Sequence, residues 1–362
     1  MPTKIPLSPD EVTSSWLTQA LHRSGRLHSG AAAEVIDIQP LSAGTAYSTL
    51  MYRIKIAAPG LPESAILKLS VDGPARQILD NIGAYAREVA FYRDLGGELP
   101  VRIPQAYVAE FDAKTNDMIL LIEDLAPLAP VDQTVGLTLA QAEAAVDGLA
   151  RYHAWSWQHP RLATFADRFP PLSGARGRGI IEQFGQFMGM VWPAAIQISG
   201  AGMSPEVAAF GQRLPALIPF FLDRLSAPAT IIHGELRGEN LFFDHDGSLI
   251  LIDFQVVTQG CGLIDVAYLL SQSLPTELRR GQDERLVRRY WNGLVAGGVA
   301  DYAWQQAWEQ YRLAVAYNLI LPGVAFTAYE ASDQRGKTLL LKMLSRASAA
   351  IADNDSLTII PK

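Results

Sequence analysis

Residues 233–255 read HGELRGENLFFDHDGSLILIDFQ, and the prediction of the fold starts from this stretch. Two apolar arms flank the pair Asp246-Gly247, which is a strong signal for a hairpin turn. Asn240 thus stands where the predicted hairpin begins and Asp253 where it ends. The turn brings an amide and a carboxylate side by side although thirteen positions separate them in the sequence.

Oxygen ligands grouped in this way suit a hard, partly hydrated cation such as Mg²⁺. Asn240 and Asp253 are therefore the candidate metal ligands, although each residue type is also common in ordinary turns. Glu235, five residues before Asn240, adds a carboxylate that is free to face a substrate. His233 could be a base or a ligand in an unrelated enzyme, but its neighbours favour a structural histidine.

Composition bounds the class of protein. With 362 residues, 49% hydrophobic and 19% charged, the chain is globular and long enough for one large domain or two lobes. The formal charge of −7 argues against nucleic acid as the main partner and is compatible with a cationic substrate. The single cysteine, Cys261, excludes an internal disulfide, and a cytoplasmic location is the simpler interpretation.

Targeting and membrane segments are not expected. Residues 1–10 contain prolines and lack an apolar core of signal-peptide length. The most apolar late stretch, residues 313–326, is interrupted by Asn318, Pro322 and Gly323 and is too short to span a bilayer. We predict that it is the end of a buried helix and that the protein has no membrane span.

The N-terminal part reads as a small antiparallel sheet with helices. A capping box at Ser8–Glu11 predicts a helix over 9–23, and helical spacing predicts another over 78–95. Alternating apolar residues predict strands over 34–40, 49–56, 64–69, 105–111 and 118–122. The proline-rich residues 126–130 are typical of a linker.

The rest of the chain is mainly helical, and the 233–255 stretch is its one β element. Helical periodicity predicts helices over 139–158, 180–198, 205–225, 263–274, 283–296, 303–321 and 333–352. The pattern indicates an α+β protein with a sheet-bearing first part and a larger helical second part.

The 233–255 stretch resembles the catalytic core of the protein-kinase-like superfamily. Its His-Gly-acid opening is closer to the aminoglycoside phosphotransferase branch, and closer still to choline-kinase-like and ecdysteroid-kinase-like proteins. The resemblance implies a two-lobed fold, with a nucleotide-binding lobe over 1–125 and a catalytic, substrate-binding lobe over 126–362. It is firm at 65–92, 119–125 and 233–267.

The resemblance also assigns roles to the residues of the core stretch. It implies that Glu235 occupies the base position, that Asn240 and Asp253 hold Mg²⁺, and that His233 braces the loop. Asp265 resembles the Asp that caps the next helix and is given a structural role, tying down the catalytic loop. One departure matters, because the family usually has Asp where this chain has Glu235.

Lys68 and Glu88 are the candidate phosphate-positioning pair. Lys68 lies on the predicted third strand, and Glu88 follows twenty residues later on a predicted helix. In kinase-like folds such an ion pair orients the phosphates of ATP. The alternative is a solvated edge lysine, but the order of strand, helix and core motif favours the ion pair.

Two further segments are candidates for nucleotide contacts. The small-residue loop with Ser42 and Gly44 is expected to cover the phosphates through backbone N–H groups, although with one glycine it also fits an ordinary hairpin turn. Glu123 and Leu125 lie where the superfamily binds the adenine edge, and a charged linker explains them equally well.

The expected function is ATP- and Mg²⁺-dependent phosphorylation of a small-molecule hydroxyl. The additional methylene of Glu235 moves its carboxylate, and a misplacement of about 1 Å costs about 100-fold in rate, which leaves measurable activity. The alternatives are a pseudokinase that binds nucleotide or metabolite without transfer, and an unrelated metal hydrolase using Glu235 and Asp253. Arg237 either touches phosphate or substrate or is a solvated loop residue.

The acceptor is predicted to be an uncharged or lipophilic alcohol. Aromatic residues of the helical part could line a pocket for it, although at helical spacing such residues more often belong to the core. An aminoglycoside would need an acidic cleft, and the sequence has no dense carboxylate cluster near its C-terminus. The choice between ATP and GTP and the oligomeric state do not follow from the sequence.

Overall fold

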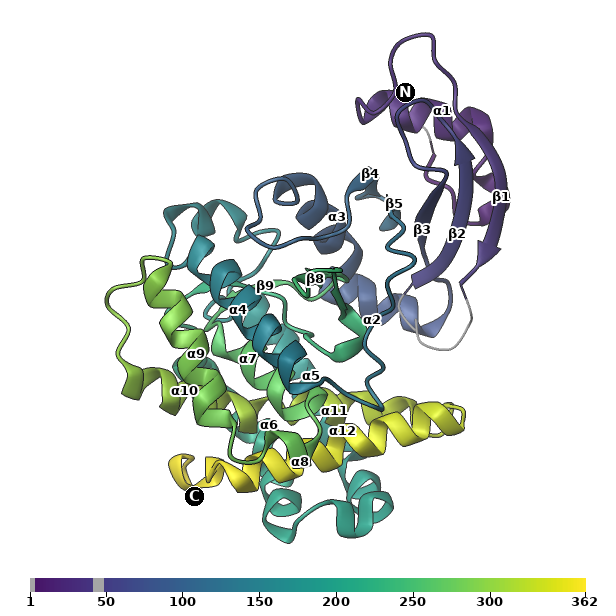
Figure 1. Ribbon diagram of the computed structural model, residues 1–362. Helices are drawn as coiled ribbons and strands as arrows, with labels where there is room; N and C mark the ends of the chain where they lie inside the picture. Colours follow the sequence, from purple (N-terminus) through teal and green to yellow (C-terminus); the bar gives the residue numbers. More distant parts are fainter. Residues whose placement is uncertain (1–3, 42–48) are drawn as a thin grey trace. The chain divides into compact units, whose positions relative to one another are not determined.

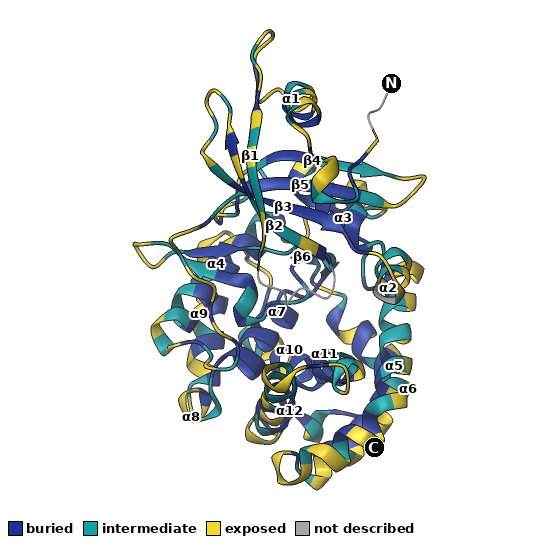
Figure 2. Ribbon diagram, turned by 90° about the vertical axis from the view of Figure 1, so that its right-hand side faces the viewer, coloured by how far each residue is buried: buried dark blue, intermediate teal, exposed yellow. Residues whose placement is uncertain are grey.

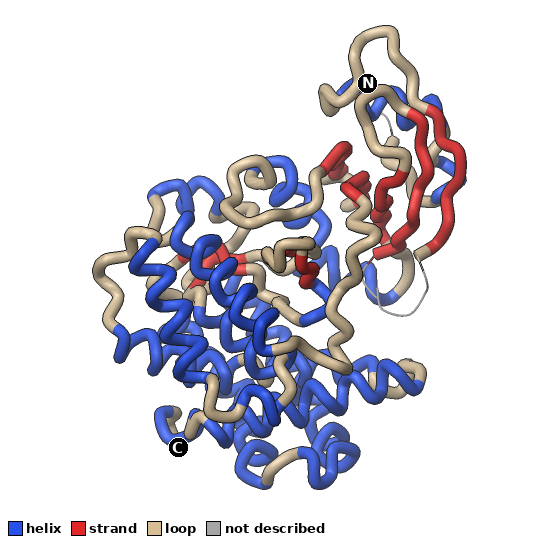
Figure 3. Tube along the Cα trace, viewed as in Figure 1, coloured by secondary structure: helices blue, strands red, loops and turns tan. Residues whose placement is uncertain are grey.

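The computed structural model describes residues 4–41 and 49–362 (Figure 1). The chain divides into two compact units, Met1–Ala129 with Ile252–Val256, and Pro130–Leu251 with Val257–Lys362. The first holds a five-stranded antiparallel sheet and the second is mainly helical, as the tube in Figure 3 shows. This is the α+β class that the sequence predicts.

The sheet of the first unit has the strand order β1-β2-β3-β5-β4, with every neighbouring pair antiparallel. The elements of this unit are η1 (Pro9–Glu11), α1 (Ser14–Arg23), β1 (Glu34–Pro40), β2 (Thr49–Ala57), β3 (Ser64–Ser70), α2 (Pro74–Ile82), α3 (Ala84–Asp94), β4 (Ala106–Asp112) and β5 (Asp117–Glu123).

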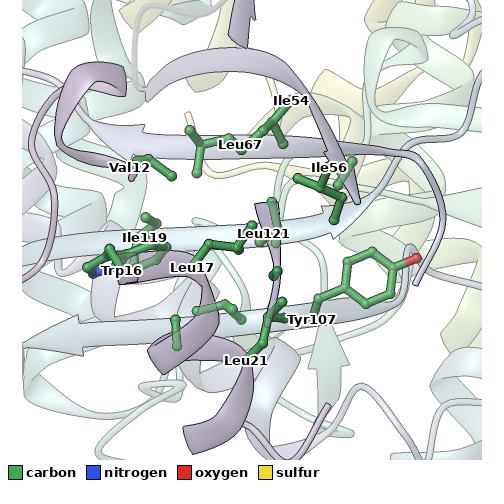
Figure 4. Packing of buried hydrophobic residues seen from close by; sticks show 14 of the residues in the cluster. Val12, Trp16, Leu17, Leu21, Ile54, Ile56, Leu67, Tyr107, Ile119 and Leu121 are labelled. Carbon is green, nitrogen blue, oxygen red and sulfur yellow. The ribbon is translucent and has the colours of Figure 1, made fainter. Parts of the chain in front are cut away.

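Helix α1 covers one face of this sheet. Its apolar residues Trp16, Leu17 and Leu21 pack against Leu67 of β3 and Leu121 of β5 in one buried cluster (Figure 4). Because side chains alternate along a strand, every second residue of β3 and β5 enters this layer. Burial of this apolar layer is the main contribution to the stability of the unit.

The other face of β3 carries Ile66 and Lys68, and both are buried. Helix α3 packs against β4 and β5 and contributes the buried Glu88. A strand with an apolar layer on one face and a helix on the other has no solvated side, so β3 is buried from Ala65 to Ser70. A lysine in such a strand requires an anionic partner.

The prediction of one continuous helix over 78–95 is wrong, since the structure has two helices, α2 and α3. Gly83 separates them with a φ of +70°, a left-handed conformation that glycine adopts without steric cost. Ile82 and Tyr85 are buried, whereas Ile78 is 45% exposed and does not share their face.

The predicted helix over 9–23 also begins later than expected. Residues 9–11 form the short 3-10 helix η1, and α1 begins at Ser14 with Thr13 as its N-cap, accepting from the N–H of Trp16 at 3.2 Å. The Glu11 carboxylate accepts from the N–H of Leu7, so the expected capping box does not form.

The second unit consists of packed helices and two small strand pairs. Strand β6 (Thr230–Ile232) pairs with β9 (Thr258–Gly260), and β7 (Leu241–Phe243) with β8 (Leu249–Leu251). Its helices are α4 (Leu139–Ser156), η2 (Pro160–Phe165), α5 (Ala175–Ser199), η3 (Gly200–Gly202), α6 (Pro205–Leu225), η4 (Gly238–Asn240), α7 (Leu263–Tyr268), η5 (Leu269–Ser273), α8 (Thr276–Arg279), α9 (Asp283–Ala296), α10 (Trp304–Tyr317), α11 (Ile320–Ala325), η6 (Phe326–Ala328), α12 (Gln334–Asp353) and η7 (Ser356–Ile359).

Helix α7 lies at the centre of this unit, and all its residues are buried (Figure 2). The predicted helix over 263–274 is divided, because α7 continues as the π-helical turn η5. The predicted helix over 303–321 also ends early, at Tyr317. Pro322 has no N–H to donate to the carbonyl of Asn318, and the side chain of Gln272 donates to that carbonyl instead, at 3.1 Å.

No helix within residues 4–41 and 49–362 is long and apolar enough to cross a membrane. The apolar stretch 313–326 forms the end of α10 and all of α11, and most of its residues are buried.

Candidate active site

In the first unit, three charged side chains meet at β3. The Nζ of Lys68 lies 2.5 Å from Oε1 of Glu88 and 3.3 Å from Oδ1 of Asp253. The side chains of Lys68 and Glu88 are 6% and 0% exposed, and that of Asp253 is 21% exposed. The structure therefore forms the predicted ion pair and adds Asp253 to it.

The two carboxylates keep Lys68 charged. Burial opposes its charge, but Asp253 and Glu88 outweigh this effect and raise the pKa of the Lys68 ammonium. Lys68 is thus held in its charged form by the two acids beside it.

The segment 252–256 is fixed to α3 by its side chains. The ring of Phe254 stacks on that of Phe91, with centroids 3.7 Å apart, and meets the ring of Tyr92 edge-on. The side-chain amide of Gln255 donates to Oε2 of Glu88 at 3.3 Å. Glu88 therefore has a partner at each carboxylate oxygen.

Asp253 has a φ of +69°, in the left-handed region. This conformation is uncommon for residues other than glycine, although Asp tolerates it better than most. Such outliers persist where the surrounding structure fixes them, and they concentrate at functional sites. The aromatic stacking of Phe254 provides this constraint on one side of Asp253.

In the second unit, Asp265 holds the loop that begins at His233. Its carboxylate accepts from the backbone N–H groups of His233 at 2.7 Å and Gly234 at 2.9 Å. The ring nitrogen Nε2 of His153 lies 3.2 Å from the same carboxylate, and Nδ1 of His153 bonds with the hydroxyl of Tyr290 at 2.8 Å. Asp265 thus ties down the loop as expected, from the first turn of α7 rather than as its cap.

The loop is shaped further by its own first residues. Gly234 has a φ of +83°, which lets the chain turn sharply after β6. The buried ring of His233 then accepts from the N–H of Glu235 at 3.3 Å through Nδ1. His233 fixes the backbone of Glu235 and is structural, while the Glu235 side chain remains 32% exposed.

Asn240 stands directly before the hairpin of β7 and β8, in which Leu241 pairs with Leu251. Its side-chain nitrogen donates to the carbonyl of Glu235 at 2.9 Å. This bond orients the amide and leaves its oxygen as the atom that suits a cation. Gly238, two residues earlier, donates its N–H to Oε1 of the buried Gln133 at 2.6 Å.

The structure describes only some of the residues that are predicted to contact the nucleotide. Ser42 and Gly44 lie outside the residues that the structure describes. The Glu123 carboxylate is engaged by Arg102 at 2.7 Å and by the N–H of Gln105 at 3.1 Å, and Leu125 is buried. None of these contacts tests a role in binding adenine, which stays a prediction.

The structure brings Lys68, Glu88 and Asp253 together in the first unit, and Glu235 and Asn240 together in the second. The shared metal site of Asn240 and Asp253 stays a prediction. Sequence reasoning overlooked Gln255, His153 and Gln133 as supporting residues. The position of Gln255 directly after Asp253-Phe254 was the one local signal for any of them.

Solved structures share the fold at low sequence identity. A structure assigned as an aminoglycoside phosphotransferase, from Ralstonia eutropha JMP134, has a TM-score of 0.55 at 12% identity and covers 94% of this chain and 97% of its own. Choline kinase from Cryptosporidium parvum Iowa II also scores 0.55 at 12% identity, with 90% of each chain covered. The GDP complex of a mutant aminoglycoside 2'-phosphotransferase-IIIa scores 0.53 at 13% identity and covers 93% of this chain and 98% of its own.

Fold and residue groups therefore place the chain in the protein-kinase-like superfamily of small-molecule kinases, and the predicted resemblance is confirmed. The sequence model of the Ecdysteroid kinase-like family matches residues 43–298. This match spans more than half of the chain, which belongs to the ecdysteroid kinase-like family. No curated protein sequence is matched.

Proposed function

We propose that the protein transfers the γ-phosphoryl group of ATP, with Mg²⁺, to a hydroxyl group of a small molecule. The observation that carries this proposal is the buried cluster of Lys68, Glu88 and Asp253. A lysine held between two acids, in a family of small-molecule kinases, fits the binding of phosphates and metal better than it fits a purely structural pair.

In this proposal Lys68 binds the phosphates of the nucleotide, and Glu88 and Gln255 keep Lys68 in place. Asp253 and Asn240 hold Mg²⁺. Their carboxylate and amide oxygens are the hard ligands that Mg²⁺ takes, and one or two protein ligands are enough because phosphates and waters complete its shell. Bound Mg²⁺ neutralises the charge that develops on the phosphoryl group.

Glu235 orients the acceptor hydroxyl and takes its proton. His233 fixes the Glu235 backbone and Asp265 fixes the loop, so the site is rigid at its base while the reacting side chain keeps access to solvent. This arrangement supports positioning, the main requirement of phosphoryl transfer. We propose that the backbone around Glu123 and Leu125 contacts the adenine, and that the loop with Ser42 and Gly44 covers the phosphates.

ATP is the proposed donor, and GTP is the alternative because a neighbour in fold was solved with GDP. The acceptor is proposed to be an uncharged or lipophilic alcohol. The aromatic residues of the helical unit give this choice little support, because Trp192, Tyr311 and Tyr317 are core residues and Trp304 and Trp308 stack on each other.

The second candidate is a nucleotide-binding pseudokinase, favoured by Glu235 at a position where Asp is usual. We would distinguish the two by measuring ATP and GTP consumption with Mg²⁺ over a panel of hydroxylated small molecules. Wild type, Asp253→Asn and Glu235→Asp are compared, with the exposed Glu284→Gln as a matched control.

Acceptor-dependent turnover that is lost in Asp253→Asn and kept in Glu284→Gln is the expected result. If wild type is silent and Glu235→Asp turns over, the protein is a disabled kinase. If the wild-type protein does not bind nucleotide at all, both candidates are wrong.

A further inference from the structure

Five side chains of alternating charge form a continuous series on the helical unit. Arg237 lies between Glu235, at 3.7 Å, and Glu239, at 3.6 Å. Arg335 of α12 then lies between Glu239, at 3.7 Å, and Asp132, at 3.5 Å. The series begins at the proposed base, passes through Arg335 of α12 and ends at Asp132 on the segment before α4, about a hundred residues from Glu235 in the sequence.

Glu239 is the exceptional member. Its side chain is 13% exposed, and both its carboxylate oxygens are buried without a hydrogen-bond partner among the described residues. A buried carboxylate that accepts no hydrogen bond costs free energy of folding, so a purely structural role would favour a neutral residue here. The two arginines nearby offset part of this cost through charge alone.

Arg237 is the link between Glu239 and the proposed base. Nε of its guanidinium lies near Glu235 and Nη1 lies near Glu239, so Arg237 bridges the two glutamates. Because Glu has one more rotatable bond than Asp, Glu235 has more orientations to restrict before it can take a proton. A cation held in a fixed place beside its carboxylate restricts them.

We propose that Glu239 and Arg335 are positioning residues that act through Arg237 on Glu235. Glu239 holds the Arg237 guanidinium beside the Glu235 carboxylate, and Arg335 compensates the charge of Glu239. The series thereby orients the longer Glu235 side chain, so that its carboxylate can take the acceptor proton at a position where the family usually has Asp. This inference rests on the proposed phosphotransferase function and adds to it the residues that make Glu235 competent.

The test measures kcat and the KM for ATP in Glu239→Gln and Arg335→Gln, with Glu284→Gln as control. Glu284 forms an exposed ion pair with Arg288 in the same unit and loses the same charge. We expect kcat to fall about tenfold in Glu239→Gln, and about threefold in Arg335→Gln, because a misplaced reacting group slows the transfer step. The KM for ATP should stay within about twofold, since neither residue is proposed to touch the nucleotide.

A double-mutant cycle separates positioning from general damage. In the Arg237→Gln background, Glu239→Gln should lower kcat by less than about twofold, because the residue through which it acts is gone. Arg335 is half exposed, so Arg335→Gln keeps the test valid if Glu239→Gln does not fold.

If the wild type is active and kcat is equal in Glu239→Gln, Arg335→Gln and the control, the positioning role is overturned. The proposed function then stays intact. Additive effects of Glu239→Gln and Arg237→Gln overturn the positioning role as well. If wild type transfers phosphate to no acceptor, the proposed function fails, and the inference fails with it.

Discussion

The two groups of site residues are held in opposite ways. In the first unit, Lys68 forms ion pairs with Glu88 and Asp253, and these ion pairs hold the three side chains in place. In the second unit, the Asp265 carboxylate holds the backbone N–H groups of His233 and Gly234, and the Glu235 side chain is 32% exposed. Lys68, the proposed phosphate ligand, is thus part of the core, whereas Glu235, the proposed base, extends from a backbone that is held by hydrogen bonds.

This difference predicts how substitutions behave. A change at Lys68 alters fold and function together, because the same contacts serve both. A change at Glu235 alters function and spares the fold, because the loop is held by Asp265 and His233. Stability measurements on selected variants can therefore test this difference.

The largest effect is expected for Asp265→Asn. The neutral amide loses the charge-assisted hydrogen bonds to two backbone N–H groups and the contact with His153, and we expect the free energy of unfolding to fall by about 4 kcal/mol. Chemical denaturation of the variant measures this loss, with the exposed Asp301→Asn as control. A loss below about 1 kcal/mol would show that the loop does not depend on this carboxylate.

Lys68→Met should cost less, about 3 kcal/mol, because it leaves Glu88 buried beside Asp253 without its cation. Adding Glu88→Leu should restore most of this stability, since an apolar pair can replace a buried ion pair. Nucleotide binding by titration calorimetry should be lost in both proteins. A stable double variant that still binds nucleotide would contradict the role of Lys68.

The smallest effect is expected where an ion pair is partly exposed. Asp124 bonds with Arg53 at 2.7 Å and with Ser64 at 2.6 Å. Burial works against its charge, but these two bonds hold the pKa of the Asp124 carboxyl below its ordinary value of 3.8. Asp124→Asn should cost about 1 kcal/mol at pH 7, because Arg53 is 42% exposed and the pair is screened by water.

The pH dependence of that difference gives a second check. A carboxyl with a depressed pKa in the folded state stabilises the protein above its unfolded pKa, and the contribution is lost as pH falls through the folded value. The gap between wild type and Asp124→Asn should therefore be constant at neutral pH and close below pH 3.8. The exposed Asp72→Asn, measured in the same way, serves as the control.

Local patterns predicted much of this structure. The strand over 34–40 and the helix over 283–296 agree with β1 and α9 because alternation and helical spacing are properties of neighbouring residues. The ion pair of Lys68 and Glu88 was also within reach, from a strand cation followed by a helix acid. The helix breaks at Gly83 and Asn318 were not predicted. The first depends on the left-handed backbone conformation of Gly83, and the second depends on the missing N–H of Pro322.

The supporting residues were beyond local patterns. His153 reaches Asp265 across 112 positions, and Gln133 reaches Gly238 across 105. Such hydrogen bonds form only after the chain has folded, and no spacing rule anticipates them. The sequence therefore indicated candidate side chains and could not show which residues hold them.

The assignment of residues 252–256 to the first unit has a consequence for biosynthesis. A ribosome makes the chain from the N-terminus, and folding of early segments generally starts before synthesis ends. The sheet and α3 are complete by residue 123, but Asp253 and Phe254 are made only after about half of the helical unit, residues 130–251. Until then Phe91 lacks its stacking partner and Lys68 has one acid instead of two. The first unit is therefore completed late, by residues 252–256, which follow the first part of the helical unit in the sequence.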